Sequence, residues 1–179
     1  MNDQAQAELK KIFNGRFSTS ESTRANYARG EDTYDPVLSK AVVFPETNEE
    51  VSKILTLCNK HKIPVVPFGT GTSLEGNVVG NDKGITISLE KMNKILSVNA
   101  LDFDCRVQAC VTKEQLNEYL REDGVFFPID PGANAAIGGM ASTSASGTMA
   151  VKYGTMKTVI TGLTVVLPSG EIVKTGSRT

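Results

Sequence analysis

The 179-residue sequence predicts an α+β fold. Its first half reads strand, helix, strand, because apolar runs at 41–44 and 64–68 flank an amphipathic segment at 47–61. Near the end of the chain, two short apolar runs at 161–167 and 171–175 are separated by Pro168-Ser169-Gly170, a tight hairpin sequence. Long crossovers early in the chain and hairpins late favour an α+β fold over a doubly wound parallel sheet.

The N-terminal residues predict one helix, 4–13, followed by a polar loop. The helix at 47–61 has stronger signals. Thr47 and Glu50 have the spacing of a capping box, in which the hydroxyl and the carboxylate satisfy main-chain N–H groups reciprocally. Apolar residues at i, i+3, i+4 and i+7 then define one buried face: Val51, Ile54, Leu55 and Cys58.

Three further strands are predicted at 84–89, 95–98 and 105–111, with a turn at 99–102. A further helix follows a second capping-box sequence, which runs from Thr112 to Gln115. Its apolar stripe is Leu116, Tyr119 and Leu120, and Gly124 suits the position after its C-terminus.

These elements divide into a short leader and one domain. We expect residues 1–35 to form an N-terminal helix and loop, and residues 36–179 to form a domain of two α/β lobes. The small lobe, about 36–98, is a β-α-β unit. The larger lobe, about 99–179, has a mixed or antiparallel sheet flanked by helices.

Composition excludes several classes of protein. Apolar residues make up 40% of the chain and charged residues 22%, as in ordinary globular domains. The net charge of −1 gives no reason to expect a nucleic acid partner. No segment approaches the roughly 18–20 apolar residues of a membrane span. The polar N-terminus lacks a signal-peptide core, so we expect a cytoplasmic location.

Cysteine and histidine are too sparse to predict a metal site. The chain has three cysteines, Cys58, Cys105 and Cys110, with no C-x-x-C spacing, and one histidine, His61. We expect three buried, unpaired cysteines and no metal. His61 is expected to be a solvated residue at the end of the 47–61 helix, where its protonated form suits the helix dipole.

A glycine-rich loop is the first candidate binding site. It directly follows the 64–68 strand and comprises Pro67, Phe68, Gly69, Thr70, Gly71, Thr72 and Ser73. Glycine permits a turn with positive φ, and successive N–H groups in such a turn can form an anion-binding nest. The sequence therefore predicts a phosphate or diphosphate ligand here, with a plain turn as the alternative.

A second loop, at 128–147, is unusually rich in Gly, Ala, Ser and Thr. Gly138 and Gly139 precede a predicted short helix, 140–144, whose N-terminus suits a phosphate. Thr143, Ser144 and Ser146 supply hydroxyl groups for sugar-like oxygens of a ligand. The alternative is that the small residues only permit close packing of a helix against a sheet.

Several motifs occur in an order that resembles the vanillyl-alcohol oxidase/p-cresol methylhydroxylase (PCMH) type of FAD-binding domain. The resemblance runs from about residue 34 to 179 and is strongest for the branch containing D-lactate dehydrogenases and glycolate oxidase FAD subunits. The motifs that carry it are the loop 67–73, F-P-I-D-P-G at 127–132, I-G-G-x-x-x-T-x-A-x-G at 137–147, Y-G at 153–154, and G-L-T-V-V-L-P-S-G-E-I-V-K-T-G at 162–176.

The resemblance implies FAD-binding roles for individual residues. The loop 67–73 would hold the diphosphate, and Asp130, Pro131 and Gly132 would flank the flavin. The ADP and ribityl side would be lined by Gly138, Gly139, Thr143, Ser146 and Gly147. The remaining implied contacts are Tyr153 and Gly154 with the cofactor, and Ile172 and Val173 at the adenine end. Because residues 69–76 contain no histidine, we expect the FAD to be non-covalent.

The resemblance also implies an activity for a longer protein. Relatives continue with a substrate-binding cap domain, so we expect this chain to be an N-terminal portion that does not turn over substrate alone. The intact parent would oxidise a D-2-hydroxy acid, of D-lactate or glycolate type, to a 2-oxo acid. No catalytic residue is assigned. Homo-oligomerisation or association with a C-terminal half stays open. So do two alternatives: another enzyme of this fold, such as an enolpyruvyl reductase or ether-lipid synthase, and a flavin-free partner-binding module.

Overall fold

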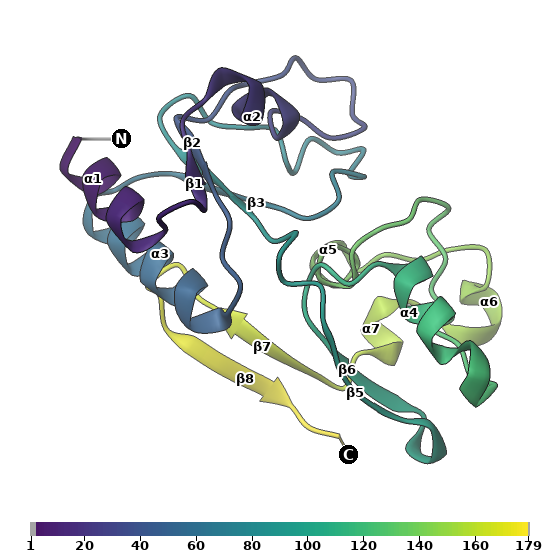
Figure 1. The fold of residues 1–179 in the computed structure, drawn as a ribbon. Helices are drawn as coiled ribbons and strands as arrows, with labels where there is room; N and C mark the ends of the chain where they lie inside the picture. Colours follow the sequence, from purple (N-terminus) through teal and green to yellow (C-terminus); the bar gives the residue numbers. More distant parts are fainter. Residues whose placement is uncertain (1–2, 179) are drawn as a thin grey trace. The chain divides into compact units, whose positions relative to one another are not determined.

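The computed structural model describes residues 3–178 (Figure 1). The chain folds into two units, each packed within itself. The first contains the residues up to Lys91 together with Thr164–Lys174, and the second contains Met92–Leu163 together with the residues from Thr175 onward. The N-terminal leader thus belongs with the first unit, and the expected boundary near 98 lies at residue 91.

The first unit is built on a four-stranded sheet with the order β1-β2-β4-β3. Strand β4 is central: it runs parallel to both β2 and β3, with Ala41 opposite Ile85 and Val65 also opposite Ile85. All four β4 residues are buried. β1 pairs antiparallel with β2 at the edge. The strands are β1 (Phe17–Ser18), β2 (Ala41–Val43), β3 (Val65–Phe68) and β4 (Ile85–Ser88).

Two helices of this unit, α1 (Asp3–Ile12) and α3 (Asn48–Lys60), pack side by side (Figure 1). Their apolar faces and the sheet share one core, which includes Leu9, Ile54 and Ile85, each 0% exposed. Burial of such side chains supplies the main stabilisation, about 1.5–3 kcal/mol for each large one. The predicted strand–helix–strand unit of the small lobe is therefore confirmed.

Of the two reciprocal hydrogen bonds of the capping box predicted at Thr47 and Glu50, only the one accepted by Thr47 forms. Thr47 accepts a hydrogen bond from the Glu50 N–H (3.2 Å), as predicted. The Glu50 carboxylate accepts from the Glu46 N–H (2.7 Å) and forms a bidentate pair with Arg16 (2.6 Å for both bonds). It thus links α3 to the N-terminal segment.

The second unit contains a two-stranded antiparallel sheet and short helices. Its strands are β5 (Ile95–Asn99) and β6 (Asp104–Val107), joined by the 3-10 turn η1 (Ala100–Asp102). Apolar side chains from the helices and the sheet fill two small cores. The helical elements are α4 (Lys113–Leu120), η2 (Arg121–Asp123), α5 (Ile137–Thr143), α6 (Ala150–Tyr153) and α7 (Met156–Val159).

The C-terminal hairpin is formed as predicted by β7 (Gly162–Val166) and β8 (Ile172–Gly176), which make a two-stranded sheet. Gly170 has φ +90°, and its N–H donates to the Leu167 carbonyl (2.8 Å). The hairpin tip packs on α3, where the Ser52 hydroxyl donates to the Gly170 carbonyl.

Three local expectations are wrong. The polar loop after α1 contains β1 and the helix α2 (Glu21–Asn26), which is capped by Ser20. The strand expected at 105–111 ends at Val107. Cys105 is exposed, because β5 and β6 form a two-stranded sheet with an open face, whereas Cys58 and Cys110 are buried.

The structure also bears on the predictions for His61, for metal binding and for membrane spans. His61 follows the last residue of α3 at the C-cap, as expected, but the expectation that it is solvated is wrong, because the residue is half-buried and its Nε2 atom is buried. Among residues 3–178, no three His, Cys, Asp or Glu side chains gather as metal ligands would. None of the helices in the same range is long and apolar enough to cross a bilayer.

Candidate functional site

The glycine-rich loop leaves the sheet at the carboxyl end of β3. Pro67 and Phe68 are the last two residues of that strand, and the turn begins at Gly69. Gly71 has φ +75°, the left-handed conformation that the sequence predicted. Phe68 is buried, and a Cβ added to Gly71 would lie 2.8 Å from the Cζ atom of its ring. The turn is therefore seated on the Phe68 ring.

The main-chain donors of this loop are available to a ligand. The N–H groups of Gly71, Thr72 and Ser73 donate to no acceptor among residues 3–178. The Thr70 and Thr72 hydroxyls lie 3.4 Å apart. Ser73 is engaged within the loop, where its hydroxyl accepts from the Asn77 amide (3.1 Å). Unpaired N–H groups at a positive-φ turn are what an anion requires.

An aromatic cluster supports the loop from within the first unit. The Phe68 ring packs edge-on against Tyr27 (5.1 Å between centroids), and Tyr27 in turn packs against Phe44 (5.6 Å). The Tyr27 hydroxyl donates to the Glu90 carboxylate (2.5 Å). These contacts hold the Phe68 ring in the place where Gly71 rests.

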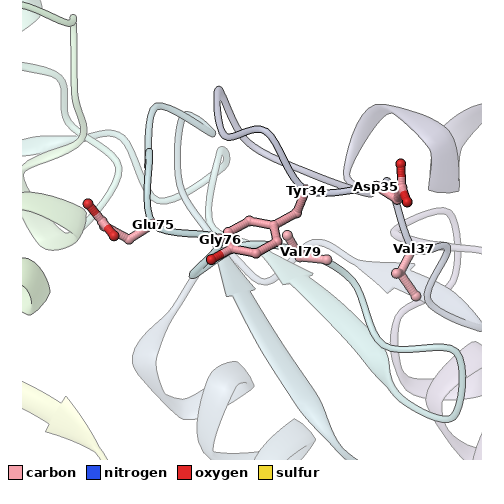
Figure 2. Close-up of a pocket in the computed structure, with 6 residues that line it drawn as sticks. All are labelled: Tyr34, Asp35, Val37, Glu75, Gly76 and Val79. Atoms are coloured by element: carbon pink, nitrogen blue, oxygen red, sulfur yellow. The ribbon is translucent and has the colours of Figure 1, made fainter.

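A shallow pocket of about 400 Å³ lies beside the loop (Figure 2). The Tyr34 ring lies against Gly76, where an added Cβ would be 2.7 Å from two ring atoms. Asp35 and Glu75 line the pocket, and their carboxylates point away from each other in Figure 2. Two carboxylates oppose binding of an anion, so this pocket is not a diphosphate site.

The second loop begins at a charged turn. The Lys113 ammonium donates to the Asp130 carboxylate (2.8 Å), which also accepts from the Gly132 N–H (3.2 Å). The hydrogen bond from Lys113 is the main reason that the pKa of Asp130 lies below its usual range. Pro131 and Gly132 are exposed, and Gly132 has φ +88° with open space at its Cβ position.

Helix α5 differs from the expected helix 140–144, because it begins at Ile137 and so contains both Gly138 and Gly139. Its first N–H groups are not free for phosphate: Ile137 donates to Val111 and Gly138 to Ala109, both at 2.8 Å. The neighbouring chain segment therefore occupies the first two N–H groups of the helix, and no acceptor is found for the Gly139 N–H among residues 3–178. Binding of a phosphate at this helix N-terminus stays a prediction, with Gly139 as its remaining donor.

The two glycines of α5 have different surroundings. A Cβ on Gly138 would lie 2.7 Å from the Ala109 Cβ, so Gly138 permits close packing, as the alternative interpretation predicted. A Cβ on Gly139 would meet nothing within 4 Å. Gly139 thus presents open backbone, and it is the one of the two that suits contact with a ligand.

Several of the other residues predicted to bind FAD in the second unit make contacts within the protein. The Thr143 hydroxyl bonds back to the Gly139 carbonyl (3.2 Å), whereas Ser146 is exposed. Gly147 lies directly against the Asp130 backbone, which leaves no room for a Cβ. Tyr153 packs edge-on against Phe126 (5.5 Å). Gly154 has φ +81° and ends α6.

Ile172 and Val173 lie at the start of β8. Ile172 is 37% exposed and Val173 is half-buried. Both belong to the first unit, as do all seven residues of the loop 67–73. Asp130 to Gly154 belong to the second unit.

Three residues beside the first loop were not identified from the sequence: Gly30, Glu31 and Asp32. The Glu31 N–H donates to the Gly71 carbonyl (3.0 Å). Asp32 is 8% exposed and accepts from the N–H groups of Gly30 and Tyr34. An aspartate in a loop is common in any sequence, so only the burial of Asp32 in the structure shows that it holds the backbone of Gly30 and Tyr34.

Comparison with curated proteins finds relatives among FAD-linked oxidoreductases. The chain is 41% identical over 174 residues to the mitochondrial D-lactate dehydrogenase [cytochrome] of Arabidopsis thaliana, covering 96% of this chain and 31% of the relative. It is 31% identical over 164 residues to the glycolate oxidase subunit GlcD of Bacillus subtilis, covering 90% and 35%. The chain thus spans about a third of the length of these relatives.

Solved structures share the fold. An alkyldihydroxyacetonephosphate synthase superposes with a TM-score of 0.87 at 21% identity, over 99% of this chain and 35% of that one. A substrate-bound p-cresol methylhydroxylase gives 0.81 at 23% identity, over 97% and 35%. The expected PCMH-type α+β fold is confirmed. Residues 39–176 match the model of the FAD binding domain family, and the chain belongs to that family.

Proposed function

We propose that this chain is the FAD-holding part of an enzyme that oxidises a D-2-hydroxy acid, of D-lactate or glycolate type, to a 2-oxo acid. Membership of the FAD binding domain family supports the cofactor. The names of the relatives, D-lactate dehydrogenase and glycolate oxidase subunit, support the substrate class. The chain matches about a third of the length of each relative, and absence of turnover by this portion alone stays a prediction.

The observation that carries the proposal is the turn at Gly71. Its positive φ and the unpaired N–H groups of Gly71, Thr72 and Ser73 fit the negative oxygens of a diphosphate. The hydroxyls of Thr70 and Thr72 lie in the same turn and add donors. Gly139 offers open backbone for another part of FAD. The residues present therefore fit a dinucleotide cofactor.

Within this proposal, the flavin supplies the hydride acceptor for the substrate Cα–H bond. The residues of this chain bind FAD and orient it. Main-chain N–H groups of the loop 67–73 would hold the diphosphate, and the turn at Asp130–Gly132 would flank the flavin. The backbone of Ile172 and Val173 would contact the adenine end. No histidine occurs at 69–76, so binding is non-covalent. No catalytic base and no carboxylate-binding arginine is assigned among the residues of this chain.

The first test is the binding of FAD by the chain itself. We expect the purified chain to take up FAD, which is detected by quenching of flavin fluorescence and by an absorbance spectrum shifted from that of free flavin. A released, intact FAD after denaturation would support non-covalent binding. A folded chain that takes up no FAD would contradict the proposal and favour a partner-binding module.

The second test addresses the substrate. The chain replaces the matching segment of the Arabidopsis thaliana relative, to which it is 41% identical. We expect the chimera to bind FAD and its flavin to be bleached by D-lactate or glycolate without oxygen. The Gly71→Val chimera serves as the matched control. A chimera with bound flavin that neither acid reduces would contradict the substrate class. The cytoplasmic location stays a prediction, which fractionation of cells tests directly.

A further inference from the structure

The segment that precedes the family-matched region contacts the diphosphate loop directly. The match begins at residue 39, yet the Glu31 N–H donates to the Gly71 carbonyl (3.0 Å). A Cβ on Gly30 would lie 2.7 Å from that same carbonyl oxygen and 2.8 Å from the Ser73 carbonyl oxygen. Two carbonyls of the loop thus lie against residues 30–31.

The direction of these carbonyls decides where the loop's donors point. In a trans peptide, the carbonyl of one residue and the N–H of the next point in opposite directions. The N–H groups of Thr72 and Leu74 therefore point away from Gly30 and Glu31. Neither donates to an acceptor among residues 3–178. The contacts with residues 30–31 thus leave two N–H groups directed to the opposite side and without an acceptor among residues 3–178.

Asp32 holds residues 30–34 in the required shape. Its carboxylate accepts from the Gly30 N–H (3.1 Å) and the Tyr34 N–H (3.0 Å), one at each oxygen. It is the charged residue among the buried polar side chains of the described range, at 8% exposure. The Ala28 carbonyl accepts from the Gly80 N–H (3.0 Å), so the same segment also contacts the chain seven residues after the loop.

From these contacts we propose that Asp32 is a positioning residue for FAD binding. Through Gly30 and Glu31, it fixes the Gly71 and Ser73 carbonyls so that the Thr72 and Leu74 N–H groups face the diphosphate. This inference rests on the proposed function, because it takes FAD as the ligand of the loop. It extends the binding machinery to residues 28–32, upstream of the family-matched region.

The test uses amide NMR of the ¹⁵N-labelled chain. Without FAD, Asp32→Ala is expected to shift the amide resonances of Gly71, Thr72 and Ser73 and to leave those of α3 in place. Its affinity for FAD is expected to fall by at least about tenfold. Asp32→Asn keeps one acceptor oxygen, so its affinity for FAD is expected to lie between that of the parent chain and that of Asp32→Ala. Asp35→Ala is the matched control, because the Asp35 carboxylate is exposed and accepts no hydrogen bond from residues 3–178.

The outcomes separate the two proposals. Unchanged loop resonances in Asp32→Ala, or an unchanged affinity for FAD, would overturn the positioning role. So would an equal loss of affinity in Gly84→Ala, a variant that crowds the Pro64 backbone in the same unit without touching the loop. Failure of FAD to move the Gly71, Thr72 and Ser73 amides of the unaltered chain would instead overturn the assignment of the loop to the diphosphate.

Discussion

The ring of Phe68 lies against Gly71, with 2.8 Å between the ring Cζ atom and the position that a Cβ on Gly71 would occupy. Phe68 is the last residue of β3, so the strand that leads into the loop also supports its turn. A side chain at residue 71 therefore meets two obstacles: a positive φ and an aromatic ring held in place by Tyr27.

Gly71→Val is accordingly expected to abolish FAD binding. The left-handed conformation costs a side-chain-bearing residue about 1–2 kcal/mol, and valine must also displace the Phe68 ring. Gly15→Val is the control, since Gly15 has φ +76° but nothing within 4 Å of its Cβ position. Fluorescence titration with FAD is the measurement. A Gly71→Val chain that binds FAD as the parent does would refute the role of the loop.

The two glycines of α5 are expected to respond oppositely to alanine. Gly138→Ala crowds Ala109 and is expected to destabilise the chain by about 1–3 kcal/mol. Gly139→Ala meets no neighbour and is expected to stabilise the helix by roughly 0.5–1 kcal/mol, while FAD affinity falls. Urea unfolding and FAD titration measure the two effects. Unchanged FAD affinity in Gly139→Ala would remove Gly139 from the binding surface.

The Arg16–Glu50 pair predicts a dependence of stability on pH. Its hydrogen bonds lower the pKa of Glu50 from 4.5 to about 2. A carboxyl with a depressed folded-state pKa stabilises the fold above its unfolded pKa, and this contribution is lost as the pH falls from about 4.5 toward 2. Because both side chains are partly exposed, we expect about 1–2 kcal/mol.

The measurement is urea unfolding at a series of pH values. Glu50→Gln is expected to be less stable than the parent at pH 7 and to lose less stability toward acid. Glu49→Gln, on the same helical turn but exposed, is the control and is expected to follow the parent. If the Glu50→Gln and parent chains lose stability in parallel, the ion pair is not a stabilising contact.

The hairpin tip is expected to be sensitive at Gly170. This residue has φ +90°, and an added Cβ would lie 2.8 Å from the Ser52 carbonyl oxygen on α3. Gly170→Ala should therefore destabilise the chain by about 2–3 kcal/mol, from backbone strain and crowding together. Ser52→Ala, which only loses its hydroxyl bond to Gly170, should cost about 1 kcal/mol. Equal stability of Gly170→Ala and the parent would argue against this packing.

Local patterns in the sequence predicted the small lobe well. The apolar runs, the N-cap at Thr47 and the glycines of the first loop are short-range signals, and each has a short-range physical cause. Helix α2 was missed although Ser20 is an N-cap residue, because its six residues carry no apolar stripe. The exposure of Cys105 depends on what covers one face of β6, which no local pattern states.

The sequence alone determined the strand–helix–strand order of the small lobe, the positive-φ turn at Gly71 and, through its motifs, the FAD binding domain family. Tertiary structure decided which small residues pack against a neighbour and which have open space beside them. Gly138 and Gly139 are identical neighbours in the sequence, yet one packs on Ala109 and the other is open. Likewise, Asp32 became visible only because folding buries it beside the loop. The reason is physical: backbone conformation depends on nearby residues, whereas burial and close approach depend on distant ones.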